Sequence, residues 1–364
     1  MNLVFFTSES VTDGHPDKMC DQIADAILDQ ALKQDPNSKM AVEATIKDNF
    51  VLIYGEANTK AVIDYAQVAK DVIADIGYPE DYEVMVKVNK QSSQINNAVV
   101  SQENVGAGDQ GIMFGFACNE TENYMPLPIH LAHALSKRLS DAKSEIDWLY
   151  PDGKTQVTVA YEGNEPKFVH TVLVSASHRA GIDHATIEKT VMESIIKPVI
   201  DSKWITEETR FIVNPSGEFS IAGPFSDSGT TGRKIVVDSY GGFGRIGGGC
   251  FSSKDPSKVD RSAAYFSRYV AKSVVAAGLC DKIELQLSYA IGLSDPLSIH
   301  IDTFGTHKRP ESEILDIIKA NFDFKVGNII SELNLLRPIY RNTANFGHFG
   351  RDGFPWEVIK PLKF

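Results

Sequence analysis

A helix–hairpin–helix order that recurs three times is the strongest constraint on how this chain can fold. Hairpin patterns begin near residues 41, 155 and 282, and a helical pattern precedes and follows each of them. We interpret the repeat as three related units, each a mostly antiparallel sheet with helices on one face, which is an α/β (α+β) fold. The alternative is a chance alternation, because hairpins and helices alternate in many α+β proteins.

The expected elements follow hydrophobic periodicity, and the first helix shows it best. That helix begins at Pro16 and places Cys20, Ile23, Ile27 and Ala31 on one face. The other expected helices are Ala61–Ile76, Pro128–Leu139, Ala185–Ile196, Val259–Ala277 and Glu311–Phe322. The expected strands are Ala41–Ile46, Val51–Tyr54, Thr155–Tyr161, Phe168–Ser175, Ile235–Val237, Lys282–Ala290 and Leu297–Thr303.

The length of 364 residues exceeds one core of ordinary size, so several domains are expected. We place an N-terminal α/β domain at 1–90, a central one at 106–218 and a C-terminal one at 219–364, with units that can interleave. The polar segment 91–105 between the first two lacks strong periodicity and is expected to be a flexible loop over a site. A disordered surface loop would have the same composition.

Composition excludes several classes of protein. The net charge of −12 argues against a nucleic-acid partner and favours a small anionic ligand held by a local group of basic residues. Four separated cysteines contain no C-x-x-C pair, so neither a zinc site nor a disulfide framework is expected. The apolar run at residues 3–6 is too short for a signal peptide or a membrane span, which favours the cytoplasm.

Four glycine-containing loops carry the chemistry, at Gly14–Lys18, Gly106–Gly111, Asp227–Lys234 and Gly247–Lys258. Each places free backbone beside carboxylates, lysines or a histidine, the groups that hold a polyphosphate and its metal ions. None matches the Walker A pattern, so a P-loop nucleotidase is disfavoured.

Three of the four loops also have a simpler explanation. Gly14–Lys18 is also typical of a helix start with an exposed histidine, and Gly106–Gly111 of a glycine turn that enters a strand. In the fourth loop Ser257 and Asp260 match a helix-capping box, although capping does not explain three glycines and two lysines.

Taken together, the motifs resemble one family. G-H-P-D-K, G-A-G-D-Q-G, T-G-R-K-I-V-V-D-S-Y-G-G and G-G-G-C-F-S-S-K-D-P-S-K-V-D-R-S-A-A-Y are similar to S-adenosylmethionine synthetases, in order, from Phe6 to about Trp356. The resemblance implies three similar α/β domains about a pseudo-threefold axis. It also implies a homodimer at minimum, with each active site built from two subunits, and favours a homotetramer.

The reaction implied by the resemblance joins ATP and L-methionine. The methionine sulfur attacks C5′ of ATP and expels tripolyphosphate, which is hydrolysed to pyrophosphate and phosphate. Because the thioether is already nucleophilic, catalysis needs alignment and stabilisation of the departing polyphosphate rather than a general base. Two Mg²⁺ ions and one K⁺ ion per site are implied as cofactors.

The resemblance assigns roles residue by residue. Positions similar to the family's catalytic residues are His15, Lys154, Arg233 and Lys254. Positions similar to its ATP-binding residues are His15, Lys154, Glu218, Phe219, Asp227, Arg233, Lys234, Cys250 and Lys254. Positions similar to its methionine-binding residues are Glu56, Gln91, Asp109, Asp227 and Lys258. The implied metal ligands are Asp17 and Asp260 for Mg²⁺ and Glu43 for K⁺.

The chain departs from the family pattern at four positions. Glu218 stands where arginine is common, Gly153 replaces an alanine, Ser253 replaces a glycine and Ile246 stands where histidine is frequent. Two other functions are weighed against the same loops. A Mg²⁺-dependent polyphosphatase or kinase-like enzyme would share only the phosphate-binding residues. An inactive nucleotide-binding regulator is expected to have lost His15, Lys154, Arg233 or Lys254, and all four are present.

Overall fold

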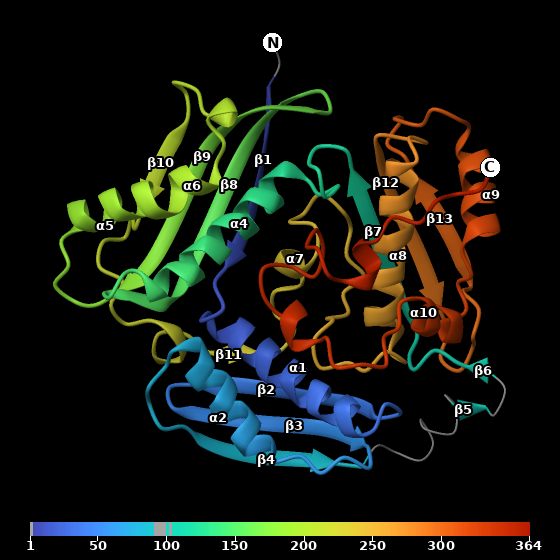
Figure 1. Ribbon diagram of the computed structural model, residues 1–364, viewed down its shortest axis with the longest axis horizontal. Coiled ribbons are helices and arrows are strands. Elements are labelled where there is room, and N and C mark those ends of the chain that lie inside the picture. Colours follow the sequence, from blue (N-terminus) through green and yellow to red (C-terminus); the bar gives the residue numbers. More distant parts are fainter. Residues whose placement is uncertain (1–2, 91–99, 102–103) are drawn as a thin grey trace.

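Three sheets surround the middle of the molecule in the computed structural model, which describes residues 3–90, 100–101 and 104–364 (Figure 1). The first sheet has the order β1 (Val4–Val11), β8 (Leu149–Glu162), β9 (Glu165–His178), β10 (Arg210–Val213). The second has the order β11 (Gly229–Thr230), β2 (Lys39–Lys47), β3 (Phe50–Asn58), β4 (Glu83–Asn89). The third has the order β13 (Ser298–Asp302), β12 (Lys282–Tyr289), β7 (Gly111–Cys118).

The sheets share one pairing pattern around their central hairpins. In the first two, a strand from elsewhere pairs antiparallel with the hairpin, and a last strand pairs parallel after a helical crossover. The third sheet has the antiparallel neighbour β7 beside its hairpin β12–β13. The short pair β5 (Val100–Ser101) and β6 (Asn104–Val105) lies apart from these sheets.

Helices cover one face of each sheet (Figure 1). The first sheet packs against α4 (Leu127–Asp141) and α5 (His184–Val191), the second against α1 (Pro16–Gln34) and α2 (Tyr65–Ile76), and the third against α8 (Val259–Ala276) and α9 (Glu311–Asn321). Shorter helices are α6 (Lys197–Val199), α7 (Ile235–Asp238) and α10 (Val326–Glu332). The predicted α/β fold with three similar units is confirmed.

Each unit gives one strand to another unit. β1 from the amino terminus joins β8, β7 joins β12, and β11 joins β2, although the partners lie far apart in sequence. The loops that follow or precede these exchanged strands therefore run between the sheets. This exchange brings Gly14–Lys18 and Asp227–Lys234 to the same place, as described below.

The predicted helices and hairpins are found, and most of their ends differ by only a few residues. The second helix begins at Tyr65 rather than Ala61 because Asp64 caps it, accepting a hydrogen bond from Gln67 N. It ends at Gly77, whose φ of 109° suits a left-handed cap. The expected helix at 185–196 loosens after Val191 into a wider turn, Met192–Ile196.

One predicted strand is wrong. Residues Ile235–Asp238 form the short helix α7, not a strand, and the Asp238 amide donates to Lys234 O. Three consecutive β-branched residues favour a strand, but tertiary contacts decide here. Asp238 ends this turn in a buried ion pair with Lys18, which the hydrophobic pattern does not reveal.

Strand β1 escaped the hydrophobic pattern because two of its three buried residues are serines. Ser8 Oγ donates to Gly241 O at 2.8 Å, and Ser10 Oγ lies 2.9 Å from His133 Nδ1. Both serines are buried, so their hydroxyls need these partners. A strand whose inward side chains are polar gives no alternating hydrophobic signal.

The buried apolar side chains form two clusters. One lies under the first sheet, and the other is shared by the second and third sheets through α1 and α8. Within the described residues, none of the helices combines the length and the apolar character that a membrane crossing requires.

Candidate active site

The amino terminus of α1 forms the first wall of the candidate site. Pro16 is the first helical residue and His15 is the N-cap, whose Nδ1 accepts a hydrogen bond from Asp17 N at 3.2 Å. This is the position the G-H-P-D-K motif predicts, since proline needs no amide partner there. The side chains of His15 and Asp17 are nonetheless buried, so the exposed-histidine alternative is wrong.

Asp17 links α1 to the loop that carries Arg233 and Lys234. Its Oδ2 accepts from Lys234 Nζ at 2.6 Å, its Oδ1 accepts from Thr230 N at 3.0 Å, and Arg233 Nη1 lies 3.9 Å away. Burial opposes ionisation of this carboxyl, but the hydrogen bonds from Lys234 and Thr230 hold its pKa below the usual range. Asp17 is therefore a carboxylate at neutral pH.

Charged groups surround the His15 ring. Burial, together with the charges of Lys234 and Lys154, lowers the pKa of His15 to about 3, and the charges of Asp17 and Asp227 oppose this shift. Lys154 reaches this position because β8 pairs it with Val11, just before the G-H-P-D-K loop. The neutral imidazole therefore faces a group of positive charges, which is the arrangement that an anionic ligand requires.

A second pair of charges lies on the triple-glycine loop and α8. Lys254 Nζ contacts Asp260 Oδ2 at 2.5 Å, and both side chains are largely buried. A Cβ on Gly249 would lie 2.4 Å from the Asp260 carboxyl carbon, so only glycine allows the loop to pass this close. The loop and Asp260 also line a cavity of about 20 Å³.

The two groups of charges are neighbours through Cys250. A Cβ on Gly232 would lie 2.6 Å from Cys250 Cβ, so the loop before Arg233 packs directly on the loop before Lys254. Burial raises the pKa of the Cys250 thiol to about 11, which leaves it protonated. The structure thus brings together His15, Asp17, Lys154, Asp227, Arg233, Lys234, Cys250, Lys254 and Asp260.

The alternative explanation of Ser257 and Asp260 as a capping box at the start of α8 is wrong. Lys258 is the N-cap, and Ser257 Oγ donates to Asp255 Oδ1 instead of capping the helix. Lys258 Nζ pairs with the buried Asp255, and Ser257 O accepts from Gly108 N at 3.0 Å. The predicted Asp109 loop therefore lies next to Lys258, and the glycine turn there does lead into β7.

The remaining predicted residues stand apart. In the described ranges, neither hydrogen bonds nor ion pairs connect the exposed side chains of Glu56 and Asp109 with the group around His15. Glu43 Oε2 accepts from Tyr54 OH at 3.2 Å, also on the second sheet. Gln91 lies outside the described residues.

Phe219, the residue predicted to contact adenine, is held by a hydrogen bond of its backbone. Phe219 O accepts from His178 N at 3.0 Å, which ties the phenylalanine to the end of β9. The exposed Glu218 accepts from Ser220 Oγ and has no ion pair among the described residues.

Sequence reasoning missed the buried support behind these loops. Lys18 Nζ contacts Asp21 at 2.9 Å and Asp238 at 2.5 Å, and all three side chains are almost fully buried. Two carboxylates hold this lysine in its charged form, with a pKa above the ordinary value despite burial. The sequence signal that could have revealed this support was Lys18 itself, which lies in the G-H-P-D-K motif with His15 and Asp17, two residues to which other roles were assigned.

The carboxylates suit a divalent cation only when a ligand shares the coordination. In the part of the chain that the structure describes, no three His, Cys, Asp or Glu side chains gather as a metal group. Asp17 and Asp260 each offer one carboxylate within the group of basic residues. Mg²⁺ typically binds through one or two carboxylates together with substrate phosphates, so this donor set fits Mg²⁺ held with a polyphosphate.

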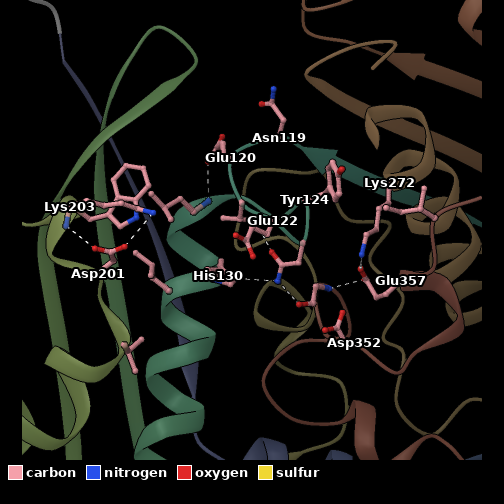
Figure 2. Close-up of a pocket in the computed structure, with 18 residues that line it drawn as sticks. Asn119, Glu120, Glu122, Tyr124, His130, Asp201, Lys203, Lys272, Asp352 and Glu357 are labelled. Atoms are coloured by element: carbon pink, nitrogen blue, oxygen red, sulfur yellow. Dashed lines mark hydrogen bonds and ion pairs between the residues drawn. The ribbon is translucent and has the colours of Figure 1, made fainter. Parts of the chain in front are cut away.

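A much larger cavity lies elsewhere and does not carry this chemistry. It has a volume of about 1010 Å³ and lies between α4 and the C-terminal segment, as Figure 2 shows with Glu120, Glu122, His130 and Asp352. Lys272 pairs there with Glu357 at 2.8 Å. Among the described residues, none of those predicted from the sequence to belong to the active site lines this cavity.

Comparisons with known proteins identify the family of this chain. Models of the N-terminal, central and C-terminal domains of S-adenosylmethionine synthetase match residues 3–104, 104–219 and 221–358. The chain belongs to the S-adenosylmethionine synthetase family. A similar relative is the S-adenosylmethionine synthase of Clostridium botulinum (strain Alaska E43 / Type E3), 49% identical over 381 residues, which cover 98% of this chain and 97% of the relative.

The predicted resemblance is therefore confirmed. In this S-adenosylmethionine synthetase fold the three matched ranges exchange strands in a cycle. The N-terminal range gives β1 to the sheet of the central range, the central range gives β7 to the C-terminal sheet, and the C-terminal range gives β11 to the N-terminal sheet.

Proposed function

We propose that this protein synthesises S-adenosylmethionine from ATP and L-methionine. Family membership and the similarity to a synthase support the reaction, and one observation carries the assignment to this site. Strand β8 and two loops far apart in sequence bring four cations, Lys154, Arg233, Lys234 and Lys254, around two carboxylates and a neutral histidine. That arrangement suits a polyphosphate that leaves as one piece and carries its metal ions with it.

The chain's residues act by orientation and charge. The methionine sulfur attacks C5′ of ATP, a carbon–sulfur bond forms, and the bonding electrons leave with the C5′ oxygen on tripolyphosphate. His15 lies at the helix terminus that faces the phosphates. Its imidazole is uncharged at neutral pH, since its pKa is about 3. It therefore acts as a neutral hydrogen-bonding group near the bond that breaks.

The lysines change partners when the nucleotide binds. Lys234 and Lys254 are neutralised by Asp17 and Asp260 in the free chain. Asp17 and Asp260 would hold the two Mg²⁺ ions, which would supply positive charge to the phosphate oxygens, and the ammonium groups of Lys234 and Lys254 would then face the phosphate chain. Arg233, exposed beside Asp17, joins them as a phosphate ligand. Hydrolysis of tripolyphosphate to pyrophosphate and phosphate uses the same residues.

The methionine end of the site is completed by a second copy of the chain in this proposal. The exposed positions of Glu56 and Asp109, away from His15, support a homodimer at minimum, and a homotetramer follows from the family. Glu218, Phe219 and Asp227 are assigned to the nucleoside, Gln91, Asp227 and Lys258 to methionine, and Glu43 to one K⁺ ion. The expected compartment is the cytoplasm.

Mass analysis of the products tests the proposal. The purified protein is incubated with ATP, methionine, Mg²⁺ and K⁺, and a sulfonium nucleoside should form only when methionine is present. Release of phosphate from ATP without methionine, and without any sulfonium product, would instead support the polyphosphatase or kinase-like alternative. Binding of ATP with no turnover of either kind would support the inactive regulator.

A further inference from the structure

Four aspartates recur at every fourth position of α1: Asp17, Asp21, Asp25 and Asp29. Residues four apart lie on the same face of an α-helix, one turn above another. Like charges so close together destabilise a helix unless each carboxylate has a partner elsewhere. The row is therefore not explained by helix formation, and its partners must be found in other segments.

Each aspartate accepts a hydrogen bond from a backbone amide in another segment of the chain. Thr230 N donates to Asp17 at 3.0 Å, Gly232 N to Asp21 at 2.8 Å and Ser253 N to Asp25 at 3.0 Å. Tyr340 N and Arg341 N donate to Asp29, both at 2.9 Å. The first three amides belong to the two loops that carry Arg233, Lys234 and Lys254, and the last two belong to the C-terminal segment.

The two middle carboxylates are fully buried and balanced by buried cations. Asp21 contacts Lys18 at 2.9 Å, and Asp25 accepts two hydrogen bonds of 2.7 Å from Arg261. Hydrogen bonds between ionised and neutral groups in such surroundings are short and strong. Lys18 contacts one oxygen of Asp21 and leaves the other for the loop amide. In Asp25, Arg261 and the loop amide share one oxygen.

Both loops pass through the left-handed region of backbone conformation. Gly232 has φ of 81°, which glycine adopts readily, whereas Ser253 has φ of 80°, a region that side-chain-bearing residues rarely adopt. Each of these residues comes directly before a predicted phosphate ligand, Arg233 or Lys254. An amide held at that point sets the direction in which the next side chain leaves the loop.

We propose that Asp21 and Asp25 are positioning residues that hold the two phosphate-binding loops in register with the amino terminus of α1. They do not touch the substrate; they place Arg233, Lys234 and Lys254 around one polyphosphate. Asp29 has the same spacing and the same kind of hydrogen bonds but holds a segment without site residues. The inference rests on the proposed function for the identity of the ligand.

Three variants of the full-length assembled protein test the inference: Asp21→Asn, Asp25→Asn and, as the matched control, Asp29→Asn. Binding of inorganic tripolyphosphate with Mg²⁺ is measured by calorimetry, together with Tm, kcat and KM for ATP. Asp21→Asn and Asp25→Asn should weaken tripolyphosphate binding and raise the KM for ATP by about tenfold or more. Asp29→Asn should lower Tm but leave both quantities within about twofold of wild type.

Wild-type affinity for tripolyphosphate in Asp21→Asn and Asp25→Asn would overturn the inference. An equal loss in Asp29→Asn would overturn it too, because general loosening would then explain the effect. Failure of the wild-type protein to make a sulfonium nucleoside would overturn the proposed function alone, because tripolyphosphate binding is measured separately.

Hydrogen exchange of the wild-type protein covers the case in which a variant does not fold. Without ligand, the amides of Gly232 and Ser253 should exchange as slowly as those in the middle of α1, because both donate to buried carboxylates. Rapid exchange at both positions, slowed only by ATP, would show that the ligand rather than α1 holds the loops and would overturn the inference.

Discussion

Lys234 Nζ donates to Asp17 Oδ2 at 2.6 Å, although the two residues lie 217 positions apart in the sequence. The contact joins the start of α1 to the loop after β11, and β11 itself is a strand of the sheet that contains β2 and β3. A proposed phosphate ligand and a proposed metal ligand thus neutralise each other in the free chain. The same relationship holds for Lys254 and Asp260.

Removal of divalent metal should therefore stop the reaction without unfolding the protein. A chelator such as EDTA is expected to abolish formation of the sulfonium product, since phosphate charge is no longer neutralised. The Tm without nucleotide should change by less than about 2 °C, because lysines already pair with both carboxylates. A large fall in Tm with EDTA would show instead that a metal ion is part of the folded free chain.

Lys254→Met should remove catalysis and keep the fold. The methylene chain is retained, while one cation facing the leaving polyphosphate is lost, so kcat should fall by about 100-fold or more. Lys319→Met, at an exposed position on α9, is the control and should match wild type. Circular dichroism and steady-state kinetics check the result, and near-normal turnover in Lys254→Met would remove this residue from the proposed phosphate site.

Ser253→Gly should stabilise the protein. Ser253 has φ of 80°, and its buried Oγ has no hydrogen-bond partner among the described residues. Glycine relieves both costs, which together exceed the entropy that glycine adds to the unfolded chain, so the free energy of unfolding should rise by about 1 kcal/mol. Urea unfolding measures it, and an unchanged or lower midpoint would contradict the prediction.

Glu357→Gln should be strongly destabilising. Glu357 accepts from Arg268, from Lys272 at 2.8 Å and from Gly350 N at 2.8 Å, and all three charged side chains are buried. Removing the carboxylate charge leaves two cations in the interior, so unfolding should become easier by about 3 kcal/mol.

The matched control is Glu332→Gln on the partly exposed Glu332–Lys360 pair, which should cost less than about 1 kcal/mol. Chemical denaturation compares the two variants. Equal losses would show that the C-terminal segment is not anchored through Glu357.

The stability contributed by His133 should depend on pH in a defined direction. Burial lowers the pKa of His133 from 6.5 to about 3, so the ring stays neutral in the folded protein while the unfolded chain takes up a proton below pH 6.5. Wild type therefore loses stability from this residue as pH falls. The deficit of His133→Gln relative to wild type should shrink by about 1.4 kcal/mol between pH 7.5 and 5.5.

Unfolding curves at the two pH values check this. A deficit that stays constant or grows on acidification would show that the His133 ring is already protonated in the folded protein.

Hydrophobic periodicity was enough to predict the three central hairpins and the long helices beside them. These elements bury one apolar face each, so β2, β3 and α1 appear in the pattern of side chains itself. Strands β1, β4, β7, β10 and β11 were not predicted, and Ile235–Asp238 was given the wrong structure. Their conformations depend on partners outside the local window.

The sequence by itself determined the chemical inventory of this protein: glycine loops, cations and carboxylates whose motifs indicate one family. Tertiary structure alone decided which of these groups meet. Lys234 reaches Asp17, and Lys254 reaches Asp260, because exchanged strands and buried carboxylates on α1 direct the loops. The spacing of motifs along a chain contains no such distance, since residues far apart in sequence become neighbours only in the folded structure.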